Sequence, residues 1–298
     1  MRLVYISDLH TDLSDRNLSL LDALVRQATA LRPDVFVVAG DLAETLRDVD
    51  SSLRTLAAIP ALRLYLAGNH DLFVEGDPPV AADSREKFER LLPAVASAAG
   101  FTYLGLDPVL WQEVAFVGVP GWYDFTLRDP CLDGVADTRT YARGFWRGHR
   151  AYDRGHVFWP RTIPSPDPGA HPSHLGGDWA GDEDIAAWML QRLETQLHAV
   201  RDAAAIVGII HVLPFPALVQ RGIFGDSPFF DAYLGSARLG SCLERFSAVR
   251  AVVSGHLHRR ARITHNGIQL VASPVGDARK SSLDLADLAR ERLGLLEL

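Results

Sequence analysis

Seven short apolar runs recur along the chain, and they limit its fold more than any other feature. Each is rich in β-branched, aromatic or aliphatic residues and is bounded by polar residues or glycine. The runs cover residues 3–7, 34–39, 62–67, 114–119, 205–210, 249–254 and 267–273. Such runs are typical of buried strands. Between them apolar residues recur at helical spacing, as in Leu18, Leu21, Leu24 and Leu31. The pattern predicts a layered α/β fold that begins as a βαβαβ unit.

The amino-acid composition and periodicity of the chain change between about residues 120 and 182. This stretch is rich in glycine, proline, arginine and aromatic residues and has no sustained period. Disordered segments are poor in aromatic residues, so we interpret the stretch as a loop-rich insertion over the core. Its arginines could clamp a phosphate, and its aromatic residues could stack on a base. Alternatively, the aromatic residues pack on the core and the arginines are solvated. We expect residues 1–298 to form a single domain that carries this insertion.

Polar side chains follow five of the predicted strands at the point where each strand ends. The carboxyl ends of strands in a layered α/β sheet line the crevice where ligands bind. Within the pairs Asp8/His10 and His256/His258 the spacing is i, i+2, so both side chains point to one side of an extended backbone. The polar residues at the strand ends are Asp8, His10, Asp41, Asn69, His70, Asp71, His211, His256 and His258.

With His70 and Asp71 set aside, convergence of these strand ends would assemble two carboxylates, one amide oxygen and four imidazoles. This set of ligands suits Mn²⁺, Fe²⁺, Zn²⁺, Co²⁺ or Ni²⁺, and it is too rich in histidine for Mg²⁺ or Ca²⁺ alone. Seven ligands are too many for one tetrahedral ion, whereas two ions that share a bridging aspartate would use them all. The sequence therefore predicts a dinuclear metal site.

The blocks "SDLH", "GDLAE", "GNHD" and "GHLH", with His211 between the last two, resemble the signature of the calcineurin-like metallophosphoesterase superfamily. This resemblance implies a four-layer αββα sandwich with a dimetal centre at the strand ends. By position, Asp8, His10 and His258 would hold the first metal. Asn69, His211 and His256 would hold the second metal, and Asp41 would bridge the two.

The same resemblance implies a reaction. A hydroxide that bridges the metals would attack a phosphomonoester or phosphodiester, and His70 would assist the leaving group. Asp71 would orient His70 or fix its tautomer; the alternative is that Asp71 caps a helix. Purple acid phosphatases carry tyrosine where this chain has Glu44, so an iron(III) charge-transfer site is not expected. Two other functions stay open, namely a nuclease acting on DNA or RNA ends and a catalytically silent scaffold with the same fold.

The composition of the chain indicates which kinds of partner it could bind. The net charge is −7 and no long run of Lys or Arg occurs, which disfavours nucleic acid and favours a small phosphorylated substrate, a nucleotide being one candidate. No stretch approaches the length of a membrane span or of a secretion signal. Cys131 and Cys242 are far apart and form no metal-binding spacing. These features predict a cytoplasmic protein without a membrane partner. They leave the oligomeric state open.

Overall fold

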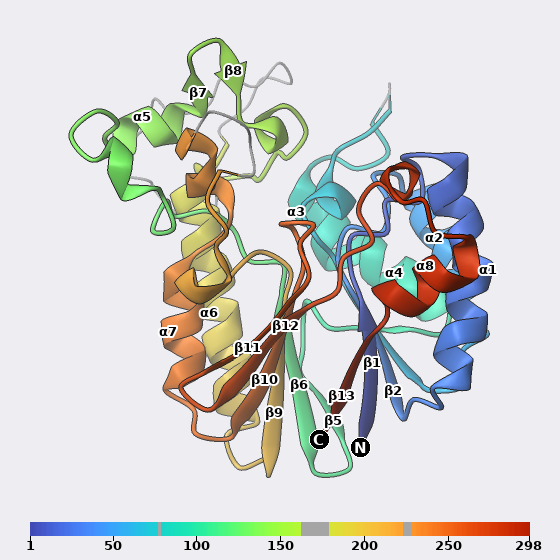
Figure 1. Ribbon diagram of the computed structural model, residues 1–298. Coiled ribbons are helices and arrows are strands. Elements are labelled where there is room, and N and C mark those ends of the chain that lie inside the picture. The colour runs from blue at the N-terminus through green and yellow to red at the C-terminus, as the bar shows by residue number, and fades with distance from the viewer. Residues whose placement is uncertain (77–78, 162–178, 223–227) are drawn as a thin grey trace.

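Two β-sheets pack face to face at the centre of the protein (Figure 1). The computed structural model describes residues 1–76, 79–161, 179–222 and 228–298. The strand order of the first sheet is β13 (Gly294–Glu297), β1 (Arg2–Ile6), β2 (Val35–Ala39), β3 (Leu62–Leu66) and β4 (Thr102–Tyr103). The order of the second is β11 (Ala261–His265), β12 (Ile268–Ala272), β10 (Val249–Ser254), β9 (Ala205–Ile210), β6 (Val114–Val119) and β5 (Val109–Trp111). Strands β1 to β4 are parallel, as are β12, β10, β9 and β6.

Side chains alternate between two cores along these strands, because successive residues of a strand point to opposite faces. One core contains residues of both sheets and none of the helices, among them Tyr5, Val37 and Val207. The neighbouring positions, such as Val4 and Phe36, belong to a second cluster that also contains helix residues. The inner strands are therefore apolar on both faces, which explains the continuous apolar runs in the sequence.

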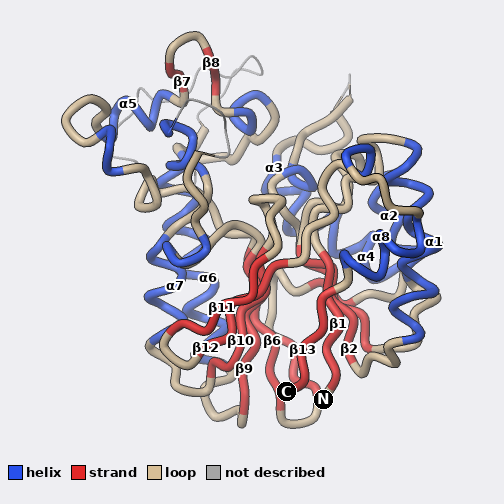
Figure 2. Tube along the Cα trace, viewed as in Figure 1, coloured by secondary structure: helices blue, strands red, loops and turns tan. Residues whose placement is uncertain are grey.

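Helices cover the outer face of each sheet, so the layers run helix, sheet, sheet, helix (Figures 1 and 2). The first sheet is covered by α1 (Asp15–Ala30), α2 (Leu46–Leu56), α4 (Leu92–Ala98) and α8 (Leu285–Arg292). The second sheet is covered by α6 (Asp182–Ala199) and α7 (Ala237–Glu244). This arrangement confirms the predicted four-layer αββα sandwich. No helix in the described part of the chain is long and apolar enough to cross a membrane.

Short elements connect the layers. They are α3 (Ser84–Glu86), η1 (His70–Leu72), η2 (Lys87–Leu91), η5 (Pro216–Leu218), η6 (Pro228–Tyr233) and η7 (Ala278–Lys280). The predicted insertion contains η3 (Pro130–Leu132), α5 (Thr138–Arg143), β7 (Phe145–Trp146), β8 (His149–Arg150) and η4 (Tyr152–Gly155), and its residues 162–178 lie outside the described residues. Trp122, Tyr123 and Trp159 of the insertion are buried, so these aromatic side chains pack on the core.

The apolar runs locate the inner strands closely, and β6, β9 and β10 have the predicted bounds. The prediction for α1 is wrong at Leu18, which is 50 % exposed, whereas Leu20 is buried. Strand β13 is not among the strands predicted from the apolar runs; it follows α8 and pairs antiparallel with β1. Its backbone completes the edge of the first sheet, so pairing with a strand almost 300 residues away along the chain defines it.

Candidate metal centre

Five of the polar residues at the strand ends have left-handed backbone conformations. The φ angles are 52° at Asp8, 44° at His10, 54° at Asp41, 70° at His256 and 54° at His258. Residues other than glycine rarely adopt positive φ, and each such residue costs roughly 1–3 kcal/mol. Five such residues in one place indicate a site where the direction of the side chains is kept at the cost of backbone strain.

Two glycines let the strand ends approach each other. A Cβ atom on Gly40 would lie 2.3 Å from Nδ1 of His211, and one on Gly68 would lie 2.2 Å from Oδ1 of Asp41. Gly40 also has a φ of +91°. Any side chain at either position would displace a polar group of the site. The glycines of the "GD" and "GN" pairs are therefore required by close packing between loops.

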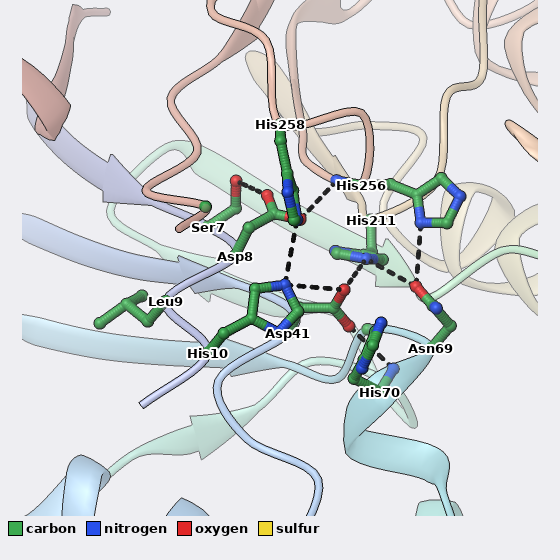
Figure 3. Close-up of polar contacts among 12 residues, drawn as sticks. Ser7, Asp8, Leu9, His10, Asp41, Asn69, His70, His211, His256 and His258 are labelled. Atoms are coloured by element: carbon green, nitrogen blue, oxygen red, sulfur yellow. Dashed lines mark hydrogen bonds and ion pairs between the residues drawn. The ribbon is translucent and has the colours of Figure 1, made fainter. Parts of the chain in front are cut away.

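The first group of side chains comes from the loops after β1 and β10 (Figure 3). Nε2 of His10 lies 3.0 Å from Nε2 of His258, and the latter lies 3.4 Å from Oδ1 of Asp8. The Ser7 hydroxyl and the His256 backbone N–H donate to the Asp8 carboxylate at 2.5 and 2.8 Å. Ligand atoms of Asp8, His10 and His258 all lie within 4.8 Å of one another, which suits one metal ion.

Asp41 lies between this group and a second one (Figure 3). Its Oδ2 is 3.7 Å from Nε2 of His10 and 3.2 Å from Nε2 of His211. Its Oδ1 accepts the backbone N–H of His70 at 2.9 Å, which fixes the carboxylate in place. A carboxylate in this position can bridge two cations.

The second group presents lone pairs to one another. Nδ1 of His211 lies 2.9 Å from the Ala39 carbonyl, which only accepts, so in the neutral ring Nε2 carries a lone pair. That Nε2 faces Oδ1 of Asn69 at 3.1 Å. His256 donates from Nε2 to the Tyr233 carbonyl at 3.0 Å, which leaves its Nδ1 facing the same Asn69 oxygen at 2.9 Å. A cation among these atoms would satisfy all of them, so the residues fit a metal ion.

The buried carboxylates of the site also favour the binding of positive charge. Burial raises the pKa of the Asp8 carboxyl, but His258 and His211 outweigh it and bring the pKa to about 2. Burial lowers the pKa of His10 to about 4. Burial opposes protonation of His211 as well, yet Asp41 raises its pKa to about 10, so without a metal ion Nε2 holds a proton that a bound ion would displace. Burial also lowers the pKa of His70, but Asp41 and Glu44 outweigh it and raise that pKa to about 9. Two buried carboxylates thus demand compensating cations.

The structure brings all seven predicted ligands together, and His70 lies beside them. The structure corrects the prediction that Asp71 orients His70. Its carboxylate is fully buried, and both oxygens accept backbone N–H groups. Glu44 is the partner of His70 instead, with Oε1 3.2 Å from Nδ1. His70 and Asp71 are adjacent in the helical turn η1, where consecutive side chains point in different directions, so Asp71 faces the loops.

The carboxylate that orients the Asn69 amide belongs to Asp153, which is not among the predicted site residues. Oδ1 of Asp153 accepts from Nδ2 of Asn69 at 2.8 Å, and its Oδ2 accepts the Tyr123 hydroxyl at 2.7 Å. The Asn69 oxygen is therefore directed into the site. Both partners belong to the insertion, 84 residues from Asn69 in the case of Asp153. No local motif marks such a contact.

The site opens into a cavity of about 1140 Å³. The strand ends provide Asp41, Asn69, His70, His256 and His258 to its lining. The insertion, η6 and the C-terminal segment provide other walls, which include Tyr152, Tyr233 and Lys280, respectively. This volume exceeds what a lone phosphate needs, so an organic molecule can reach the metal-binding side chains.

The chain belongs to the calcineurin-like phosphoesterase family, whose model matches residues 1–200. It is therefore a phosphoesterase, and the groups of potential ligands agree with metal-dependent phosphoester hydrolysis. No curated protein matches the sequence.

Solved structures share the whole architecture at low sequence identity. A phosphopantetheinyl hydrolase from Mycobacterium tuberculosis is 20 % identical, with a TM-score of 0.67 over 99 % of this chain and 95 % of that one. The protein TT1561 of Thermus thermophilus is 14 % identical, with a TM-score of 0.53 over 99 % and 97 %. A dimetal phosphatase from Danio rerio is 15 % identical, with a TM-score of 0.53 over 91 % and 86 %. At these identities the likeness is evidence for the fold alone.

Proposed function

We propose that the protein uses two divalent transition-metal ions to hydrolyse a phosphomonoester or phosphodiester of a small organic molecule. Asp41 would lie between the ions. The other ligands would be Asp8, His10 and His258 for one ion and Asn69, His211 and His256 for the other. The observation that carries this proposal is the convergence of the ligand atoms of His211, His256 and Asn69 on one point beside Asp41.

The two ions, when bound, would supply Lewis acidity for the phosphoryl group and activate water for attack at neutral pH. The mixed imidazole and oxygen ligands suit Mn²⁺, Fe²⁺, Zn²⁺, Co²⁺ or Ni²⁺. The protein itself fixes the ligand directions. Asp153 holds the Asn69 amide, and the Ala39 carbonyl holds the His211 ring.

His70 is the proposed acid for the leaving group. Its Nδ1 is engaged by Glu44, so Nε2 is the nitrogen that a substrate in the cavity can meet. A positioned acid of this kind contributes about 10²–10⁴-fold to the rate. Glu44 favours the protonated imidazole and fixes its orientation.

The leaving group is proposed to be an organic moiety, with a nucleoside as one candidate. The Tyr152 ring is 59 % exposed, lines the cavity, and has its centroid 5.6 Å from that of the His70 ring. A planar group that passes His70 would therefore meet an aromatic face. Tyr152→Ala is expected to raise KM for adenosine monophosphate more than KM for glycerol phosphate. An equal change for both substrates would remove the nucleoside from the proposal.

The proposed chemistry is tested by metal content and turnover together. Untagged protein is analysed by plasma mass spectrometry, reconstituted with Mn²⁺, and assayed with p-nitrophenyl phosphate and bis(p-nitrophenyl) phosphate. We expect about two metal equivalents and turnover of at least one ester. Asp41→Asn should abolish most of this turnover, whereas Asp22→Asn on the exposed face of α1 should not. A reconstituted protein that binds no metal and is inert would refute the proposal in favour of a scaffold.

A further inference from the structure

The cavity wall carries positive charge in a protein whose net charge is −7. Its lining includes five Lys and Arg side chains and three Asp side chains. Asp41 belongs to the proposed ligand set, and Asp153 accepts from Asn69. Asp277 is paired with Arg279, with 2.8 Å between Oδ1 and Nε. Asp41 and Asp153 are therefore engaged at the metal centre, and only Asp277, which also attracts Lys280, offsets part of the positive charge of the wall.

Four cations of the wall form what we call the cationic rim: Arg147, Arg150, Arg259 and Lys280. All four are exposed, and no carboxylate of the described ranges forms an ion pair with any of them. Charges of one sign in a concave site reinforce each other and attract anions.

The rim surrounds the cavity from separate parts of the fold. Arg147 and Arg150 lie on the β7–β8 hairpin of the insertion, and Lys280 ends η7 ahead of α8. Figure 1 places this hairpin at the upper left of the sandwich and the red segment around α8 at the right. Arg259 directly follows His258 at the end of the β10 loop.

Arg147 is presented in a defined way. Its backbone is left-handed, with a φ of 49°, and its guanidinium carbon lies 5.6 Å from the centroid of the Trp146 ring. Stacking on an aromatic ring restrains a guanidinium and leaves its N–H edge free. A restrained guanidinium binds a phosphate oxygen pair with little further loss of entropy.

We propose that the cationic rim binds a second phosphate of the substrate, away from the phosphoester that the metal centre cleaves. The substrate class is thus a small organic molecule with two phosphate groups. This inference rests on the proposed function and adds substrate specificity to it. The cavity of about 1140 Å³ has room for both groups and the carbon skeleton between them.

The test measures binding separately from turnover. Protein reconstituted with Mn²⁺ is titrated calorimetrically with propylphosphonate and with straight-chain alkane diphosphonates of increasing length. These compounds have C–P bonds that a phosphoesterase does not cleave. The same titrations are made on Arg147→Gln/Arg150→Gln. The control is Arg139→Gln/Arg143→Gln, which removes two exposed arginines of α5 outside the cavity lining. Both double variants change the net charge equally.

We expect one diphosphonate length to bind about ten- to a hundredfold more tightly than propylphosphonate. Arg147→Gln/Arg150→Gln should abolish most of that gain, and the α5 control should retain it. Metal chelation by the ligands is the same for all variants and cancels in the comparison. The absence of a gain at any length would overturn the inference, and so would a gain that survives in the rim variant. If the gain is seen but no ester is hydrolysed, the proposed function fails while the rim stands as an anion site.

Discussion

The substitution Asp71→Asn tests how the loops of the metal centre are held together. Oδ2 of Asp71 accepts the backbone N–H groups of Asp41 and Gly68 at 2.8 and 2.7 Å. Oδ1 accepts those of Leu42 and Ala43 at 3.0 and 3.2 Å. One fully buried carboxylate therefore joins the loop after β2 to the loop after β3. These loops carry the proposed ligands at positions 41 and 69.

The magnitude follows from the number of acceptors that are lost. Asparagine keeps one oxygen and places an NH₂ group where the other oxygen was, so two buried N–H groups face a donor. A hydrogen bond to a charged group contributes about 1.5–3 kcal/mol. Loss of two would cost about 3–6 kcal/mol, but the neutral amide also avoids burial of a charge beside Asp41, which the raised pKa of Asp71 puts at about 3 kcal/mol. The free energy of unfolding should therefore fall by up to about 3 kcal/mol. That is a large part of the roughly 5–15 kcal/mol by which domains are stable.

Urea denaturation measures this loss. Burial and the Asp41 carboxylate raise the pKa of Asp71 to about 6, so the assay is made at about pH 8, where the wild-type group is ionised. The urea midpoint should fall with little change in slope, and metal affinity should fall as well. Asp22→Asn on the exposed face of α1 serves as the control. An unfolding free energy equal to or above that of the wild type, together with unchanged metal affinity, would refute the bracing role.

Three further substitutions probe the surroundings of the site. Asp153→Ala frees the amide of Asn69 and should weaken metal binding about 10–100-fold by calorimetry; unchanged affinity would contradict the positioning role. His70→Ala should slow hydrolysis of an alkyl phosphate by at least about 100-fold, and that of p-nitrophenyl phosphate much less, because p-nitrophenolate leaves without a proton. Equal losses would show that His70 is not the acid. Lys87→Met removes a fully buried ammonium that donates to Glu75 at 2.7 Å, and should cost about 3–5 kcal/mol in urea denaturation. Adding Glu75→Gln to Lys87→Met should recover part of the lost free energy of unfolding. If none is recovered, the loss comes mainly from the backbone acceptors of the ammonium and not from Glu75.

The sequence alone determined the inner strands and the positions of the polar groups at their ends. Strand β9, for example, is apolar throughout because both of its faces are buried, and the run stops at His211 where the chain meets the site. Parallel strands end at the same edge of a sheet, so the side chains that follow them are predictable as one cluster. The glycines at 40 and 68 belong to the same local signal, since they precede the polar residues directly.

Only the tertiary structure decided which groups support that cluster. Asp71 braces backbone N–H groups, Glu44 takes the role beside His70, and Asp153 reaches Asn69 from the insertion. β13 likewise exists only through its pairing with β1 at the other end of the chain. Strand periodicity and strand ends are local properties that a sequence displays directly. A hydrogen bond between distant segments depends on how the layers pack, and no spacing along the chain records it.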